Sequence, residues 1–273
     1  MNTLLQRFAR SIACICLPLA LSCVPASADP IRVHAGFTAN TLAANDDDST
    51  GPVQLPFEIC FFGQRFTELY VNNNGNVTFT QALATFTPFF PNANGIPIIA
   101  PFFADVDTRT GLEVTYGSGM VGVSRAFAVN YIDVGYYPEQ TDKLNSFQLV
   151  LIERGNPGDG DFDIEFNYRT INWETGAASD GVNGFGGESA IAGFSNGAGT
   201  NFTVAGSGVD GSLLDTSATG LIYRTDNPDG IEGRITFECR DCFVAIPEPG
   251  TLPLVGIALG AVALVHRRRA RVH

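Results

Sequence analysis

The sequence predicts an all-β fold: a β-sandwich-like single domain between an N-terminal signal peptide and a single C-terminal apolar helix. From Val53 to Phe243, runs of five to eight residues rich in Val, Ile, Phe and Tyr alternate with clusters of Gly, Asn, Asp and Pro. This alternation is typical of strands and turns, and no helical period of 3.6 residues is found there. With 45% hydrophobic residues in a chain of 273, there is enough apolar surface for one core.

The N-terminus has the pattern of a secretory signal peptide over residues 1–28. A basic start, the apolar stretch Ile12–Cys23 and the small-residue site Ala26-Ser27-Ala28 follow one another as such a signal requires. Acylation of Cys23 is the alternative, but Ala20-Leu21-Ser22 before it is a poor lipoprotein motif. Residues 29–49 read as an extended lead-in, and residues 50–243 as the single domain.

Twelve strands are expected within the domain, because each segment is rich in β-formers and bounded by turn residues. They are Phe57–Phe61, Glu68–Val71, Asn76–Thr80, Ile98–Phe103, Leu112–Tyr116, Ser124–Val134, Ser146–Glu153, Phe162–Tyr168, Ser189–Phe194, Phe202–Ala205, Gly220–Arg224 and Arg234–Cys239. Residues 147–152 are apolar on both faces and are expected at the centre of a sheet, whereas residues 162–168 alternate and should face solvent on one side. Asn74-Gly75 predicts a tight hairpin turn.

The charge of the chain excludes nucleic acid as a partner. Residues 29–249 hold all 28 acidic residues but 10 of the 16 basic ones, a net charge of −18, and Lys143 is the single lysine. Such a field repels polyanions and favours solubility, cations and basic partners.

Three cysteines remain after the signal peptide, and the export route permits disulfides. We expect Cys60 to pair with Cys239 or Cys242, with a local Cys239–Cys242 bond as the alternative. A structural zinc site is not expected, because it needs a full set of Cys and His ligands close together, and His34 is the one soft ligand besides the three cysteines before the tail.

Catalysis is not expected. His34 is the sole histidine between the two ends and lies in the lead-in, which leaves a Ser or Cys nucleophile without a base. Asp105 and Asp107 form a carboxylate pair that a glycoside hydrolase could use. Arg109 lies on the same strand face and can neutralise both, so a structural polar cluster is the favoured interpretation.

No cofactor is predicted, although the acids leave calcium open. Asp159, Asp161 and Asp163 alternate as in a calcium loop, but Ile164 and Thr170 stand where an EF-hand has Gly and Glu. The acids Asp46–Asp48 are treated in the same way: calcium binding is left open, and a solvated part of the lead-in is the favoured interpretation. The Gly-rich stretch Asp180–Ser189 lacks the lysine of a phosphate-binding loop and is expected as a mobile loop. This loop and Asn156–Asp161 are the two exposed loops expected to recognise a ligand.

Several motifs in order resemble the nidogen-like extracellular (NIDO) domain. They are "LPFEICFFGQRFTELYVNNNGNVTF", "PIIAPFFADVDTR", "VGYY", "NSFQLVLIE", "NYRTINWETG" and "SAIAGFSNG". The resemblance covers roughly residues 50–240 and implies a largely β module of matrix and adhesion proteins, with no catalytic residues to carry over.

The tail, residues 244–273, resembles a PEP-CTERM sorting signal of exopolysaccharide-producing Gram-negative bacteria. Pro247, Glu248 and Pro249 precede an apolar stretch of 14 residues (252–265) and a basic cluster, Arg267, Arg268, Arg269 and Arg271. The stretch makes about 21 Å of helix, short for a hydrocarbon core of about 30 Å. The arginines are expected to stay cytoplasmic. The resemblance implies recognition and cleavage by an exosortase; a permanent anchor is the alternative.

Together these features predict a non-catalytic adhesion module, exported and held at the cell surface or in the extracellular matrix, as in a biofilm. Its expected partners are the processing exosortase and extracellular polysaccharide or matrix proteins, with membrane contact through the C-terminal segment before cleavage. The alternatives are a carbohydrate-active hydrolase and a calcium-dependent glycan-binding protein.

Overall fold

The structure, a computed structural model, describes residues 28–89, 95–156 and 158–245. The signal peptide up to residue 27, the Pro247-Glu248-Pro249 motif, the apolar stretch 252–265 and the arginines at 267–269 and 271 lie outside the described residues. Within the three described ranges, no helix is long and apolar enough to cross a membrane.

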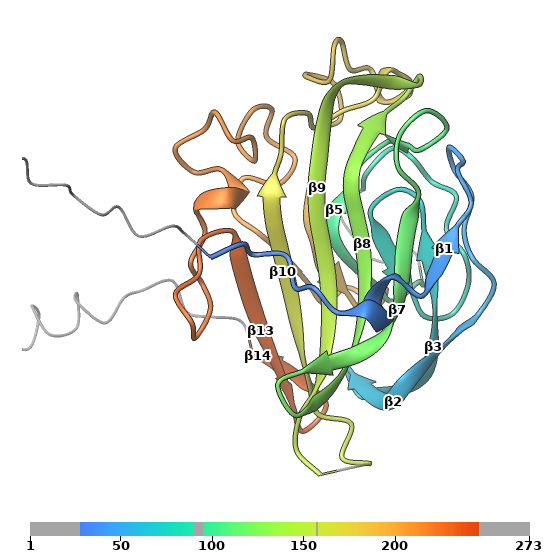
Figure 1. Cartoon of the computed structure of the whole chain (residues 1–273), viewed down its shortest axis with the longest axis vertical. Coiled ribbons are helices and arrows are strands. Elements are labelled where there is room, and N and C mark those ends of the chain that lie inside the picture. The colour runs from blue at the N-terminus through green and yellow to red at the C-terminus, as the bar shows by residue number, and fades with distance from the viewer. Residues whose placement is uncertain (1–27, 90–94, 157, 246–273) are drawn as a thin grey trace, which may run out of the picture.

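Two antiparallel sheets, one of eight strands and one of six, make up the fold (Figure 1). In the larger sheet β6 (Val106–Asp107) pairs with β8, and the other strands have the order β1 (Asn40–Leu42), β7 (Val114–Val121), β8 (Ser124–Tyr136), β9 (Gln140–Glu153), β10 (Phe162–Thr170), β13 (Arg234–Arg240) and β14 (Phe243–Ala245). The order in the smaller sheet is β12 (Asn201–Thr203), β11 (Ile191–Ser195), β5 (Ile98–Phe103), β4 (Asn76–Thr78), β3 (Gln64–Asn72) and β2 (Val53–Phe61).

The core lies between the two sheets and is rich in aromatic rings. Phe102 of β5 packs on Phe147 of β9 with ring centroids 5.2 Å apart, and the Tyr131 hydroxyl on β8 donates to the Asn72 carbonyl on β3 at 2.8 Å. Residues 147–152, apolar except for Gln148, lie on β9, between β8 and β10, and all are buried. The predicted sandwich and the predicted central strand are therefore both present in the structure, and they follow from the apolar composition of these strands.

The predicted hairpin joins β3 to β4, with Asn72 opposite Asn76 in the pairing. Gly75 has φ +74°, and a Cβ there would lie 1.7 Å from the Phe102 carbonyl oxygen. The turn therefore requires glycine twice over, for its left-handed backbone and for the close approach of β5.

The outer face of β10 does not face solvent as its alternation predicts. Asp163, Glu165 and Asn167 are all at most 5% exposed. Arg154 and Arg240 pair with Asp163, while arginines from the N-terminal segment and β13 cover the rest. Buried carboxylates need such partners because an unpaired buried charge is costly.

The segment 29–49 is packed on the larger sheet, although the sequence suggests a lead-in outside the domain. It crosses β10 and β9 (Figure 1), and Arg32 forms a two-bond ion pair with Glu165 at 2.6 and 2.7 Å. It then forms a short 3-10 helix, η1 (Ala35–Thr38), which buries Phe37, and continues as the edge strand β1 beside β7. These contacts bury Ile31, Phe37 and Leu42 and make the segment part of the fold.

One predicted strand is wrong: Gly220–Arg224 contains the 3-10 helix η3 (Leu221–Tyr223). A short apolar run does not distinguish a strand from a helical turn by period, and here the Arg224 N–H closes a turn onto the Leu221 carbonyl. The strands β1, β6 and β14 were not predicted, since each has only two or three residues.

Candidate functional site

A pocket of about 310 Å³ opens at the end of the sandwich where β8 turns into β9. One wall is formed by the end of β8 and the turn after it, with Tyr136, Tyr137, Pro138 and Gln140. The other wall comes from η2 (Ala177–Ser179) and the Gly-rich stretch that follows. Its residues are Ala177, Gly181, Val182 and Asn183.

The Gly-rich stretch is held in place by its own backbone and by the core below it. Gly184 accepts hydrogen bonds from the Glu174 and Thr175 N–H groups, and the Glu188 N–H donates to the Ser179 carbonyl at 2.9 Å. A Cβ on Gly187 would lie 2.2 Å from that same carbonyl oxygen. The glycines therefore serve a tight, hydrogen-bonded path that forms a pocket wall.

The core beneath the pocket is aromatic. Trp173 is fully buried, tilts against Tyr136 with ring centroids 5.4 Å apart, and donates its indole N–H to the Val134 carbonyl. This packing sets the position of the strand end from which Tyr137 and Pro138 project. The motif "VGYY" was noted in the sequence, but only the fold shows that its tyrosines lie beside residues 177–183.

The Asp105–Asp107–Arg109 cluster lies directly behind this pocket. The Tyr137 N–H donates to the Asp105 carbonyl at 3.2 Å, and the Ala177 N–H donates to the Tyr137 carbonyl at 3.0 Å. Arg109 binds Asp107 through both Nε and Nη2, and its Nη2 also lies 3.2 Å from Asp46 Oδ2. Arg109 thus neutralises Asp107 as predicted, but its second partner is Asp46 and not Asp105.

The pKa values of Asp105 and Asp107 are shifted in opposite directions. Burial alone would raise the pKa of Asp107, but hydrogen bonds from Arg109 and from the Glu139 and Arg109 N–H groups hold it below its ordinary value. Burial, followed by repulsion from Asp46 and Asp47, raises the pKa of Asp105 to about 7. Opposite pKa shifts are also seen in catalytic acid pairs. Whether a substrate can reach the carboxylates therefore decides between a catalytic pair and a structural polar cluster.

That access is missing. Asp105 is 1% exposed and Asp107 is fully buried, and neither carboxylate is among the residues that line the pocket. His34, the sole histidine in the described part of the chain, accepts the Gly36 N–H at the start of η1. The geometry therefore supports no acid–acid or nucleophilic mechanism at these residues.

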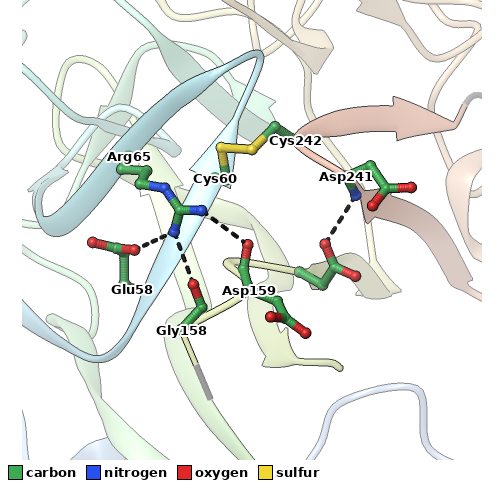
Figure 2. The surroundings of a disulfide bond; sticks show 8 residues. Glu58, Cys60, Arg65, Gly158, Asp159, Asp241 and Cys242 are labelled. Atoms are coloured by element: carbon green, nitrogen blue, oxygen red, sulfur yellow. Dashed lines mark hydrogen bonds and ion pairs between the residues drawn. A yellow bond between two sulfur atoms is a disulfide. The ribbon is translucent and has the colours of Figure 1, made fainter. Parts of the chain in front are cut away.

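The opposite end of the fold carries the disulfide, which joins Cys60 to Cys242 with an S–S distance of 2.05 Å (Figure 2). This is one of the two pairings expected, and Cys239 is left as a buried free thiol. Arg65 beside it donates to the carbonyls of Gly158 and Asp159 at 3.0 and 3.3 Å. Residues 158–161 are thereby tied to β2, β3 and the β13–β14 turn.

The three acids of the predicted calcium loop do not converge. Asp163 pairs with two arginines, Asp161 accepts the Asp241 N–H at 2.9 Å, and Asp159 accepts the Asn156 N–H. Among the described residues, a different group of acids has its carboxylate oxygens close enough together to hold a metal ion. It consists of Asp46, Asp47 and Asp105. The sequence could not have found it, because Asp105 is far from the other two along the chain.

The fold and its surface define a disulfide-bonded β-sandwich module with a surface pocket. Residues 27–224 match the family model described as NIDO related. The chain belongs to this family, and the match extends further toward the N-terminus than the motifs had indicated.

Three relatives illustrate the similarity. Mouse alpha-tectorin is 36% identical over 183 residues, which cover 58% of this chain and 8% of the relative. Drosophila melanogaster nidogen is 27% identical over 212 residues, covering 66% of this chain and 15% of the relative. Mouse nidogen-2 is 32% identical over 100 residues, 35% of this chain and 7% of the relative. The chain thus spans a small fraction of each relative, and no solved structure matches it.

Proposed function

We propose that this protein is a non-catalytic adhesion module of the bacterial extracellular matrix. The family match over residues 27–224 carries this proposal. Its relatives alpha-tectorin and nidogen are extracellular matrix proteins and not enzymes. The inaccessible carboxylates and the disulfide agree with a stable exported domain that recognises a ligand without transforming it.

The pocket between the β8–β9 turn and residues 181–183 is the proposed recognition site, and polysaccharide is its proposed ligand. Sugar rings present C–H faces that pack on aromatic rings, and the half-buried Tyr137 supplies such a ring in the pocket wall. The amides of Gln140 and Asn183 offer donors and acceptors for hydroxyl groups. A concave site with a few polar groups is the usual form of a small-ligand site.

Binding is tested by cosedimentation of the full chain with exopolysaccharide from the producing cells. Val182 lines the pocket and is 71% exposed, while Val123 lies at the far end of β8 and is 95% exposed. Val182→Asp should weaken binding about tenfold, roughly 1.4 kcal/mol, and the matched Val123→Asp should leave it unchanged. Equal binding by all three proteins would remove the pocket from the proposal, and no binding by the wild type would remove the polysaccharide.

Export and sorting complete the proposal. The signal peptide directs export, an exosortase recognises Pro247-Glu248-Pro249, and the chain is held by residues 252–265 until it is cut. Mass spectrometry of both termini, in separated cell fractions, tests this step. A mature C-terminus near residues 247–250 in surface or medium fractions is expected; a tail intact to His273 in the inner membrane would instead indicate a permanent anchor.

A further inference from the structure

The carboxylates of Asp46, Asp47 and Asp105 converge behind the pocket, although they come from distant parts of the sequence. Each offers an oxygen, and these oxygens all lie within 4.8 Å of one another. Asp46 and Asp47 lie in the segment between β1 and β2, and Asp105 follows β5. Three like charges at this distance repel strongly unless something neutralises them.

A second observation shows that the protein itself does not satisfy this cluster. Asp105 is 1% exposed, and its Oδ2 is buried without a hydrogen-bond partner. The same is true of Asp46 Oδ1. Buried polar oxygens are almost always paired, and an unpaired carboxylate oxygen is especially unfavourable.

The neighbouring donors contact oxygens of Asp46 and Asp47. Arg109 lies against Asp46 Oδ2, the oxygen opposite the unpaired one, at 3.2 Å. Asn74 Nδ2 donates to Asp47 Oδ1 at 2.8 Å. Protein donors therefore orient two of the carboxylates from outside, as supporting partners around a metal site do.

Gly176 closes the site from the side of the pocket. A Cβ at this position would lie 2.2 Å from Asp105 Oδ2, so the backbone of residues 175–177 approaches the free oxygen as closely as glycine alone allows. Ala177, the next residue, lines the pocket. The cluster and the recognition face thus share a wall.

We propose that Asp46, Asp47 and Asp105 bind a calcium ion that joins residues 45–48 to the strand end behind the pocket. All ligands are hard carboxylate oxygens, with no His or Cys in the cluster, which favours Ca²⁺ over zinc or copper. Calcium accepts irregular oxygen geometry with water completing the shell, whereas Mg²⁺ requires a near-ideal octahedron. The ion would supply a positively charged partner for Asp105 Oδ2, which has no hydrogen-bond partner within the protein. The metal site does not depend on the polysaccharide proposal.

The test is a calcium titration of the full chain after removal of metal with EDTA, followed by calorimetry and thermal unfolding. Calcium at about 100 times its Kd should raise the Tm by roughly 5–10 °C, and Mg²⁺ at the same concentration should raise it less. Asp105→Asn and Asp47→Asn should each weaken calcium binding at least about tenfold. Asp47 is only half-buried, so its variant keeps the test valid if Asp105→Asn does not fold.

The matched control is Asp159→Asn, the same change at an exposed acid of the loop that the sequence suggested for calcium. It should bind calcium as the wild type does. A second expectation is specific to the site: in EDTA, Asp105→Asn should melt no lower than the wild type, because it removes a repelling charge.

Two results would overturn the proposal. One is a wild type that shows neither binding heat nor a Tm shift with calcium; a proton shared between Asp105 and Asp46 would then satisfy the oxygens. The other is loss of calcium binding in Asp159→Asn with retention in Asp105→Asn and Asp47→Asn, which would move the site to the loop at the other end.

Discussion

Removal of the Cys60–Cys242 disulfide should strongly destabilise the protein. The bond joins β2 of the smaller sheet to the β13–β14 turn of the larger one (Figure 2). Near it, the Cys60 N–H donates to the Gly160 carbonyl at 2.8 Å and the Gly63 N–H to the Cys242 carbonyl at 3.1 Å. The disulfide thus closes the end of the sandwich that is opposite the pocket.

The magnitude follows from the length of chain that the bond closes. The two cysteines are 182 residues apart, and the loop-closure entropy of such a segment corresponds to about 5 kcal/mol at 25 °C, the upper end of the usual range. A typical domain has about 5–15 kcal/mol in total. At about 2–4 °C per kcal/mol, the Tm should fall by roughly 10–20 °C.

The assay compares urea unfolding of the wild type, the double variant Cys60→Ser/Cys242→Ser, and the control Cys239→Ala. Cys239 is buried and unpaired, so its truncation should cost only about 1 kcal/mol from the lost packing. Reduction of the wild type should reproduce the double variant. The reasoning is refuted if the unfolding free energy of the double variant lies within about 1 kcal/mol of the wild-type value. It is also refuted if reduction destabilises the wild type but no longer destabilises Cys239→Ala, because Cys239 would then be part of the disulfide.

Three further predictions concern single positions. Gly75→Ala should lower the free energy of unfolding by more than about 2 kcal/mol, because Gly75 has a positive φ and a Cβ there would clash with the Phe102 carbonyl. The control Gly63→Ala, also at positive φ but in open space, should lower it by about 1 kcal/mol in the same urea assay. Burial raises the pKa of the Cys239 thiol, so a thiol reagent at pH 8 should label it only on unfolding. Burial also raises the pKa of Glu174 above its ordinary value of 4.5. Its contribution to stability is therefore present at low pH and is lost as the pH rises through the raised pKa. Glu174→Gln should flatten this decline of the unfolding free energy above pH 4.5, and an unchanged slope would contradict the prediction.

Local patterns were sufficient for most of the strands but not for what covers them. In β10 the alternation of Phe162, Ile164, Phe166 and Tyr168 with polar residues correctly identifies the core face. It cannot show that the other face is also buried, because the arginines that cover it come from outside the strand. Arg32 reaches Glu165 across 133 positions of sequence.

The candidate site was predictable in its parts and not in its assembly. The sequence pointed to Asp180–Ser189 as a binding loop and to the acids at 46–48 and at 105, each for its own reason. The pairing of the loop with Tyr137, and of Asp46 and Asp47 with Asp105, depends on how β1, β5 and β8 end near one another. No sequence interval encodes these distances.

By itself, the sequence determined that the chain is an all-β module of the NIDO type, because hydrophobic period, turn residues and ordered motifs are local properties. It also favoured a disulfide between Cys60 and one of two partners, with a local Cys239–Cys242 bond as the alternative. Tertiary structure alone decided that Cys242 is that partner, that residues 29–49 belong to the fold, and that three distant carboxylates meet behind the pocket. The physical reason is that long-range contacts are chosen by the packing of whole sheets, which brings together residues whose own neighbours in sequence carry no sign of it.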